Sequence, residues 1–161
     1  MAVVMFLKIE GIKGESQDDK HKGEIDIMSW SWGLSQSGGH HQGGGGGSGK
    51  VNVHDISFTK HVDKSTPNIM QHCCNGKHIK AADLYVRKAG GTPIEYLKIH
   101  FEDILVSSYQ TGGSGGEDRV TESVTLNFAR FKSDYTPQKA DGTGDAAITI
   151  GWDVAANKPI G

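Results

Sequence analysis

The chain reads GLSQSGGHHQGGGGGSGKVNVHDISFTKHVDKSTPN from residue 33 to residue 68. A glycine-rich loop here leads directly into a strand and then into the start of a helix. Eight glycines lie between Gly38 and Gly49, and glycine loses more backbone entropy on ordering than any other residue. Such a loop either stays mobile in the single chain or becomes ordered against another molecule. In a small β-rich chain this favours a subunit of a larger assembly over an enzyme.

The segment Ser65-Thr66-Pro67 predicts the start of one helix, over about 66–76. A hydroxyl side chain can cap the free N–H groups of a first turn. Proline is tolerated in that turn because its missing N–H needs no partner there. Gly76 can adopt the left-handed conformation that ends a helix. We therefore expect a helix of two to three turns.

Alternation of apolar and polar residues predicts seven strands. They cover about 3–10, 24–32, 51–58, 81–88, 94–109, 119–131 and 146–154. Shifts in the alternation at His54–Asp55, and again between Phe101 and Ile104, indicate two β-bulges. One helix is too few for a parallel sheet, whose strands need crossover connections. The sequence therefore predicts a single mainly β domain over 1–161, an antiparallel β-barrel of two packed sheets with the helix alongside.

Strand 24–32 carries large apolar groups on both of its predicted faces. Ile25 and Ile27 alternate onto one face, together with Ser29 and Ser31, whereas Trp30 and Trp32 fall on the other. We expect one face in the core and the other against a neighbouring subunit, so the two tryptophans are assigned to a subunit interface or the core. The alternative is a carbohydrate platform built on the same tryptophans.

Composition excludes several classes of partner. The formal net charge is −2 without a block of like charge, so we expect no nucleic-acid partner. No apolar run approaches the roughly 20 residues of a membrane span. The N-terminal MAVVMFLKIEG lacks a basic region and a cleavage pattern and predicts a first strand, not a signal peptide. The adjacent Cys73 and Cys74 are expected to be reduced thiols, one buried and one on the helix surface.

Two glycine-rich motifs resemble catalytic signatures without their context. The run GGGGSGK (44–50) matches a phosphate-binding loop, but Val51 follows it where a serine or threonine is needed, and a strand begins where a helix is needed. The run GGSGG (112–116) places Ser114 in a G-x-S-x-G pattern, but between two strands. The eight histidines and two cysteines show no spacing that gathers metal ligands. Carboxylates such as Glu117, Asp118 and Glu122 are interpreted as solubilising. We expect no enzyme activity, no cofactor and no metal.

Several long segments, in order, resemble the haemolysin-coregulated protein (Hcp) family, the tube subunits of bacterial type VI secretion. They are SWSWGLSQSG (29–38), GGGGGSGKVNV (43–53), SFTKHVDKSTPN (57–68), GKHIKAADLYVRKAGG (76–91) and LVSSYQTGGSGGEDRVTESVTLNF (105–128). The resemblance covers nearly the whole chain. It implies a homohexameric ring that stacks into a tube, carries effectors in its pore, is capped by a spike protein and is driven by a contractile sheath. It also implies a cytoplasmic protein that type VI secretion exports as a virulence factor.

The resemblance implies roles for two groups of residues. Small hydroxyl residues suit a pore wall, so Ser31 and Ser114 are predicted to line it. The glycine-rich loop is predicted to contact the next ring through Gly43, Gly44, Gly45, Gly46 and Gly47. The competing interpretation is a secreted β-sandwich module that binds a glycan through Trp30 and Trp32. No fused toxin domain is expected, because the chain ends soon after its last strand.

Overall fold

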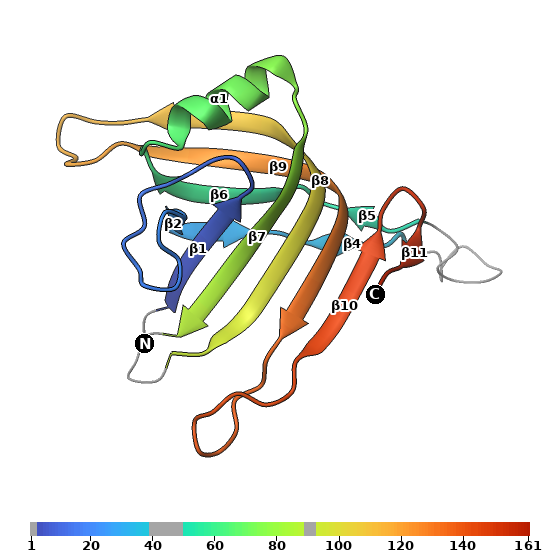
Figure 1. Cartoon of the computed structure of the whole chain (residues 1–161). Coiled ribbons are helices and arrows are strands. Elements are labelled where there is room, and N and C mark those ends of the chain that lie inside the picture. Colours follow the sequence, from blue (N-terminus) through green and yellow to red (C-terminus); the bar gives the residue numbers. More distant parts are fainter. Residues whose placement is uncertain (1–2, 39–49, 89–92) are drawn as a thin grey trace.

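The computed structural model describes residues 3–38, 50–88 and 93–161 and confirms a mainly antiparallel β fold with one helix (Figure 1). The helix α1 spans Thr66–Asn75. The strands are β1 (Val3–Ile9), β2 (Ile25–Ile27), β3 (Ser29–Ser31), β4 (Leu34–Ser35), β5 (Asn52–Val53), β6 (Ile56–His61), β7 (Ile79–Lys88), β8 (Glu95–Gly112), β9 (Thr121–Tyr135), β10 (Ile148–Asp153) and β11 (Lys158–Pro159). Within these ranges no helix is long and apolar enough for a membrane span.

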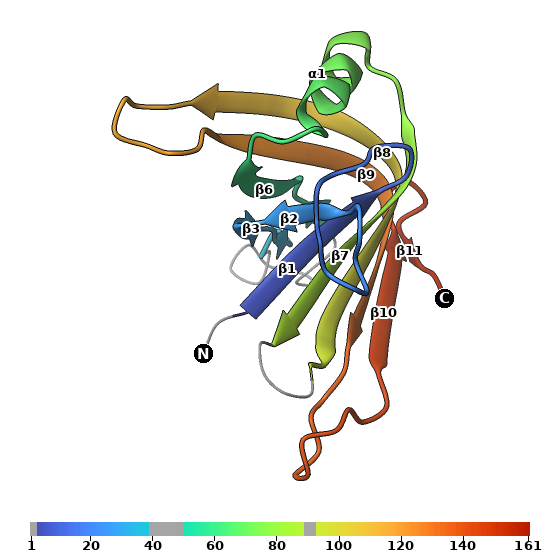
Figure 2. The same cartoon turned by 60° about the vertical axis from the view of Figure 1, so that its left-hand side comes forward.

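Two packed layers share the long strands β8 and β9 (Figure 2). One layer has the order β2-β1-β7-β8-β9-β10-β11, and in the other β6 pairs with β3 and with the first half of β9. Every pairing is antiparallel. The predicted packing of two sheets is confirmed, but the sheet is not closed into a regular barrel. The strand that links the layers is interrupted at Met28, where it leaves β1 and joins β6.

The two layers form because neighbouring strands bend at the same place. In β8 the buried positions change from Phe101 to Ile104, and in β9 they change from Phe128 to Phe131. The register is the same on both sides of this point, because each strand contributes one extra residue. Asp103 absorbs part of the bend with a φ of 56°, a conformation uncommon for a residue other than glycine. The predicted change of phase is confirmed, and a register shift lies further along, between Val106 and Ser108.

The predicted faces of strand 24–32 are partly wrong. Ile25 and Ile27 are buried as expected, but the alternation shifts at Met28, which is 46% exposed. Trp30 and Trp32 therefore pack against the same core as the two isoleucines instead of forming a second apolar face. The tryptophans belong to the core side, and this strand's two apolar faces no longer argue for a subunit interface.

The helix begins and ends where predicted, but its first turn is not capped as expected. Gly76 closes it with a φ of 67° and donates its N–H to His72 O at 3.0 Å. Ser65 does not cap the first turn, because its hydroxyl donates to Asp63 Oδ1 instead. The helix lies over β8 (Figure 1), and Ile69 is its buried apolar anchor.

Residues 11–24 cover the outside of β1 and β7. Phe6 on β1 stacks on His21 at 4.5 Å between ring centroids, and the Arg87 guanidinium lies over the same ring at 5.2 Å. Arg87 also donates two hydrogen bonds to Asp18, at 2.6 and 3.1 Å. This ion pair fastens the segment to β7.

We expect Asp18→Asn to remove a pH-dependent part of the stability. The hydrogen bonds from Arg87 are the main cause that lowers the pKa of Asp18 to about 2, against about 3.9 in an unfolded chain. Because the folded pKa is the lower one, the contribution is fully present above about pH 4 and is lost as the pH falls through about 2. Urea midpoints of the two proteins should differ at neutral pH and converge below pH 2. The neighbouring, exposed Asp19→Asn is the control, and a constant gap across this range would contradict the assignment.

Candidate functional site

A surface of uncharged, mostly small side chains covers the outer side of the layer formed by β3, β6 and the first part of β9 with β8. Cross-strand pairing arranges these side chains in two rows. We call this surface the neutral face and define it by Ser31, Ser57, Thr125 and Ser108 in one row, and Ser29, Thr59, Ser123 and Gln110 in the next. All eight side chains are at least partly exposed.

Hydrogen bonds link some side chains of this surface and of its edge. The hydroxyls of Ser57 and Thr125 lie 3.0 Å apart across β6 and β9. At the edge of the row, Ser107 donates to Asp55 at 2.8 Å, and the Asn127 amide donates to the same carboxylate at 2.8 Å. The eight residues that define the neutral face carry hydroxyl and amide groups and no charge, and the Asp55 carboxylate at its edge is held by hydrogen bonds.

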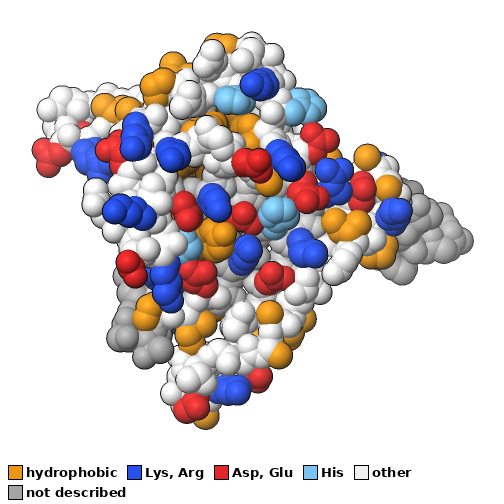
Figure 3. Space-filling model, in the orientation of Figure 1, with side chains coloured by type: hydrophobic (Ala, Val, Ile, Leu, Met, Phe, Trp, Pro, Cys, Tyr) orange, Lys and Arg blue, Asp and Glu red, His pale blue; other side chains and the backbone are white. Residues whose placement is uncertain are grey.

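The outer side of the other layer is charged (Figure 3). Acidic and basic side chains are mixed across β7, β8 and β9, with Asp83 hydrogen-bonded to His100 at 2.7 Å and Arg130 paired with Glu102 at 2.9 Å. The hydrogen bond from Arg130 is the main cause that lowers the pKa of Glu102, so this carboxylate stays ionised. We call this surface the charged face and define it by Asp83, Arg87, Lys98, His100, Glu102, Arg130, Lys132 and Asp134.

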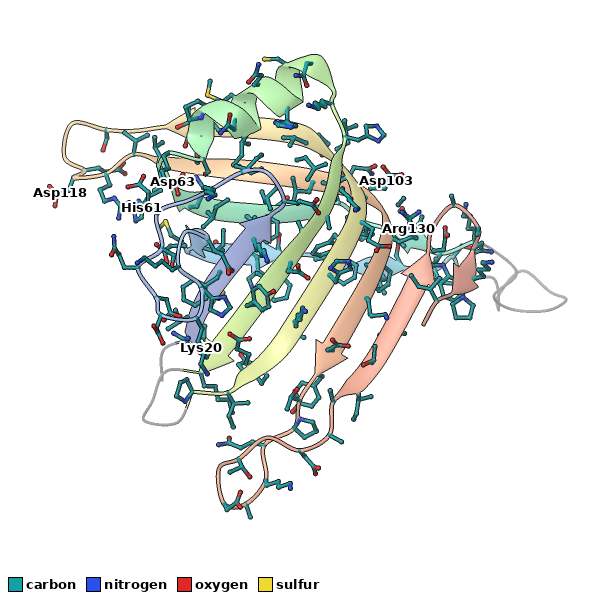
Figure 4. All side chains as sticks on the ribbon, viewed as in Figure 1. Lys20, His61, Asp63, Asp103, Asp118 and Arg130 are labelled. Atoms are coloured by element: carbon teal, nitrogen blue, oxygen red, sulfur yellow. The ribbon has the colours of Figure 1, made fainter. Side chains whose placement is uncertain are left out.

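One strand supplies both surfaces. Before its bend, β9 directs Ser123, Thr125 and Asn127 outward, and after it Arg130, Lys132 and Asp134. The bend is therefore what separates the neutral face from the charged face. Figure 4 shows Arg130 and Asp103 together at this bend.

The structure places the predicted site residues in different environments. Ser31 lies in the neutral face, paired with Ser57. Ser114 is exposed on the turn between β8 and β9, which projects from the body (Figure 2), so a single chain does not bring the two serines together in one row. The loop with Gly43–Gly47 lies outside the described residues.

Trp30 and Trp32 do not form an exposed platform. Trp32 packs edge-on against Phe131 at 4.9 Å and Phe101 at 5.9 Å, and its indole N–H donates to His54 O at 2.8 Å. A glycan platform needs open ring faces. Trp30 and Trp32 pack against the core instead, so they do not offer the exposed ring faces that the glycan-binding alternative needs.

Sequence reasoning was wrong about Glu122, which is 2% exposed instead of solubilising. Its carboxylate pairs with the 1% exposed Lys60 and accepts hydrogen bonds from Thr66 at 2.7 Å and from Tyr109 at 2.6 Å. Lys60 also donates to Asp63 at 3.1 Å. Burial, followed by the bond to Glu122, raises the pKa of Tyr109. We call these five residues the buried network.

An apolar groove of about 340 Å³ lies between β4, β5 and β10. Its walls include Leu34, Val53 and Ile150, and Leu34 and Ile150 are 50% and 62% exposed. Trp152 also lines it, and its buried indole N–H has no hydrogen-bond partner among the described residues. Ile148, 67% exposed, extends the apolar surface along β10. A patch of this kind often marks a protein–protein contact.

Known proteins share both the sequence and this fold. The family described as "Type VI secretion system effector, Hcp" matches residues 6–135. Protein Hcp1 of Pseudomonas aeruginosa is 60% identical over 159 residues, which cover 98% of each chain. The crystal structure of Hcp1 from Salmonella typhimurium superposes with a TM-score of 0.81 at 41% identity, over 99% of this chain and 100% of that one. A structure titled "Structure of a type six secretion system protein" reaches a TM-score of 0.93 at 27% identity, over 99% and 100% of the two chains.

The match to these relatives extends from the first strand to the last, and it includes the segments that carry the sequence resemblance. Secretion by the type VI system, self-assembly and a tube role belong to this family, which is not known for enzyme activity. The chain therefore belongs to the Hcp family of the type VI secretion system.

Proposed function

We propose that six copies of this chain close into a ring and that the rings stack into the secreted tube, with the neutral face as the inner wall. In this proposal the tube carries effectors in its pore, a spike protein caps it, and a sheath drives it from the cytoplasm out of the cell. The single observation that carries the proposal is the neutral face. It is a broad, uncharged, hydroxyl-rich surface on one side of a chain whose other side is charged.

The chemistry of the two faces suits these positions. A conduit needs a wall that water wets and that does not hold a passing protein by charge or by apolar contact. The rows through Ser57 and Thr59 meet this need, because hydroxyl groups bond equally to water and to cargo. The charged face, with its mixture of acidic and basic side chains, then points outward to the proposed sheath.

The apolar groove supports self-association. Leu34, Ile148 and Ile150 leave more apolar surface open than an isolated domain needs, and contact with another copy would cover it. We also propose that the loop with Gly43–Gly47 contacts the neighbouring ring. Deleting those five glycines should leave rings intact and block tube growth.

The ring itself is tested by the mass of the purified chain. Native mass spectrometry and sedimentation at micromolar concentration should show a species of six chains. A single species at the 17.3 kDa of one chain across this range would overturn the proposal.

Cargo retention tests the inner wall. We expect Ser31→Gln and Ser114→Gln to leave the ring intact, because surface substitutions usually change stability by about ±0.5 kcal/mol. Each should reduce effector co-purification roughly tenfold, equivalent to about 1.4 kcal/mol. Lys132→Gln places the same side chain on the charged face and is the matched control. Full retention by both serine variants would mean that neither residue lines the pore.

A further inference from the structure

The buried network fastens both roots of the β8–β9 hairpin at one point. Tyr109 lies three residues before the end of β8 at Gly112, and Glu122 is the second residue of β9. A hydrogen bond joins the two residues directly, since the Tyr109 hydroxyl donates to Glu122 Oε2 at 2.6 Å. Beyond them the chain from Gly112 to Val120 is exposed and projects from the body (Figure 1).

The same network fixes where α1 begins. Thr66, the first residue of the helix, donates to Glu122 Oε1 at 2.7 Å and accepts a hydrogen bond from Asp63 N–H at 3.1 Å. Lys60 on β6 completes the network by binding Glu122 and Asp63 together. Figure 4 shows Asp63 beside the start of α1 and Asp118 at the far tip of the hairpin.

Every polar group at the centre of the network has a partner. The Lys60 ammonium has three acceptors, which are Glu122, Asp63 and the His61 carbonyl oxygen. The Glu122 carboxylate accepts from Lys60, Thr66 and Tyr109. Apolar residues of similar size often give equal or greater stability than a buried ion pair, so stability alone does not account for these charges. A fully paired network does define one geometry, because any other arrangement leaves a buried charge unpaired.

We propose that Lys60 and Glu122 are positioning residues for assembly: the buried network sets the direction of α1 and of the hairpin, whose exposed tip projects from the body and would be met by a neighbouring copy in the proposed ring. The proposal rests on the proposed ring. It predicts that the ion pair can be replaced without loss of folding but not without loss of assembly.

The test is the triple variant Lys60→Met, Glu122→Leu and Tyr109→Phe, made in the full chain. Its urea midpoint should equal or exceed that of the wild type. Hydrogen exchange of the peptide 110–122 should be about tenfold faster and the fraction of chains in rings about tenfold lower, in line with looser local structure. The matched control, Lys98→Met with Asp83→Leu, removes a partly exposed pair on the charged face and should change neither quantity.

Unchanged exchange and an unchanged ring fraction in the triple variant would overturn the proposal. If the triple variant does not fold, Tyr109→Phe decides alone, because it keeps the ion pair and removes one bond to the root of β8. Faster hydrogen exchange of the hairpin together with a lower ring fraction in Tyr109→Phe would support the proposal. Wild-type values of both quantities would overturn it. A wild-type chain that forms no rings would contradict the proposed function, while the exchange measurement would still report on the hairpin.

Discussion

Replacing Lys60 alone by methionine is expected to lower the free energy of unfolding by about 3–5 kcal/mol. The variant leaves the Glu122 carboxylate, 2% exposed, without its cation. Thr66 and Tyr109 still donate hydrogen bonds to it, but neutral donors do not balance a buried charge. Urea unfolding followed by tryptophan fluorescence, at one fixed protein concentration, measures the loss.

Two comparisons separate this effect from a simple change of side chain. Lys98→Met removes a partly exposed lysine 4.0 Å from Asp83 and should change stability by about 0.5 kcal/mol or less. Adding Glu122→Leu to Lys60→Met should recover most of the loss, because the most deeply buried carboxylate is then gone and Asp63 keeps its hydrogen bonds from Ser65. A Lys60→Met protein within 1 kcal/mol of the wild type would show that water reaches Glu122.

Local patterns predicted the antiparallel fold and its helix. Pro67 and Gly76 act within a few residues of their own positions, so the limits of α1 could be predicted from sequence. The side on which Trp30 and Trp32 lie could not. Simple alternation assumes a regular strand, but this strand changes partners at Met28 and shifts its phase there.

The candidate site depends on contacts between distant parts of the chain. Ser31 stood out because it is small and flanked by strand residues, but Ser57 and Thr125 are 68 residues apart and meet only through the pairing of β6 with β9. Alternation in 121–127 separated a hydroxyl side from an apolar side. It gave no sign that matching rows lie on β3, β6 and β8.

Sequence reasoning could have predicted the buried side of Glu122 but not its partner. Glu122 is two residues before Val124, so alternation places it on the apolar side of its strand. Its cation lies on β6, 62 residues away, and no local signal pairs the two. Glutamate is rarely buried unless it is paired, so composition alone favoured the wrong interpretation.

Phe101→Ala is expected to lower the free energy of unfolding by about 3–5 kcal/mol. Phe101 is 0% exposed and lies at the bend, where both layers share β8 and β9. Its ring centroid is 4.6 Å from that of Phe128 and 5.9 Å from that of Trp32. Removing the ring leaves a cavity and takes an aromatic partner from two side chains, each pair worth about 0.5–1.5 kcal/mol beyond area burial.

Both the buried position and the size of the substituted side chain should determine this loss. Leucine fills most of the volume of the phenylalanine ring. Phe101→Leu should therefore lower the free energy of unfolding by only about 1.5 kcal/mol, clearly less than the alanine variant. Met70→Ala, on the exposed side of α1 at 43% exposure, should stay within about 0.5 kcal/mol of the wild type. Urea midpoints of the three variants give this order directly. A loss below 1 kcal/mol for Phe101→Ala would mean that the two layers collapse into the cavity, so that the bend is softer than its fixed register suggests.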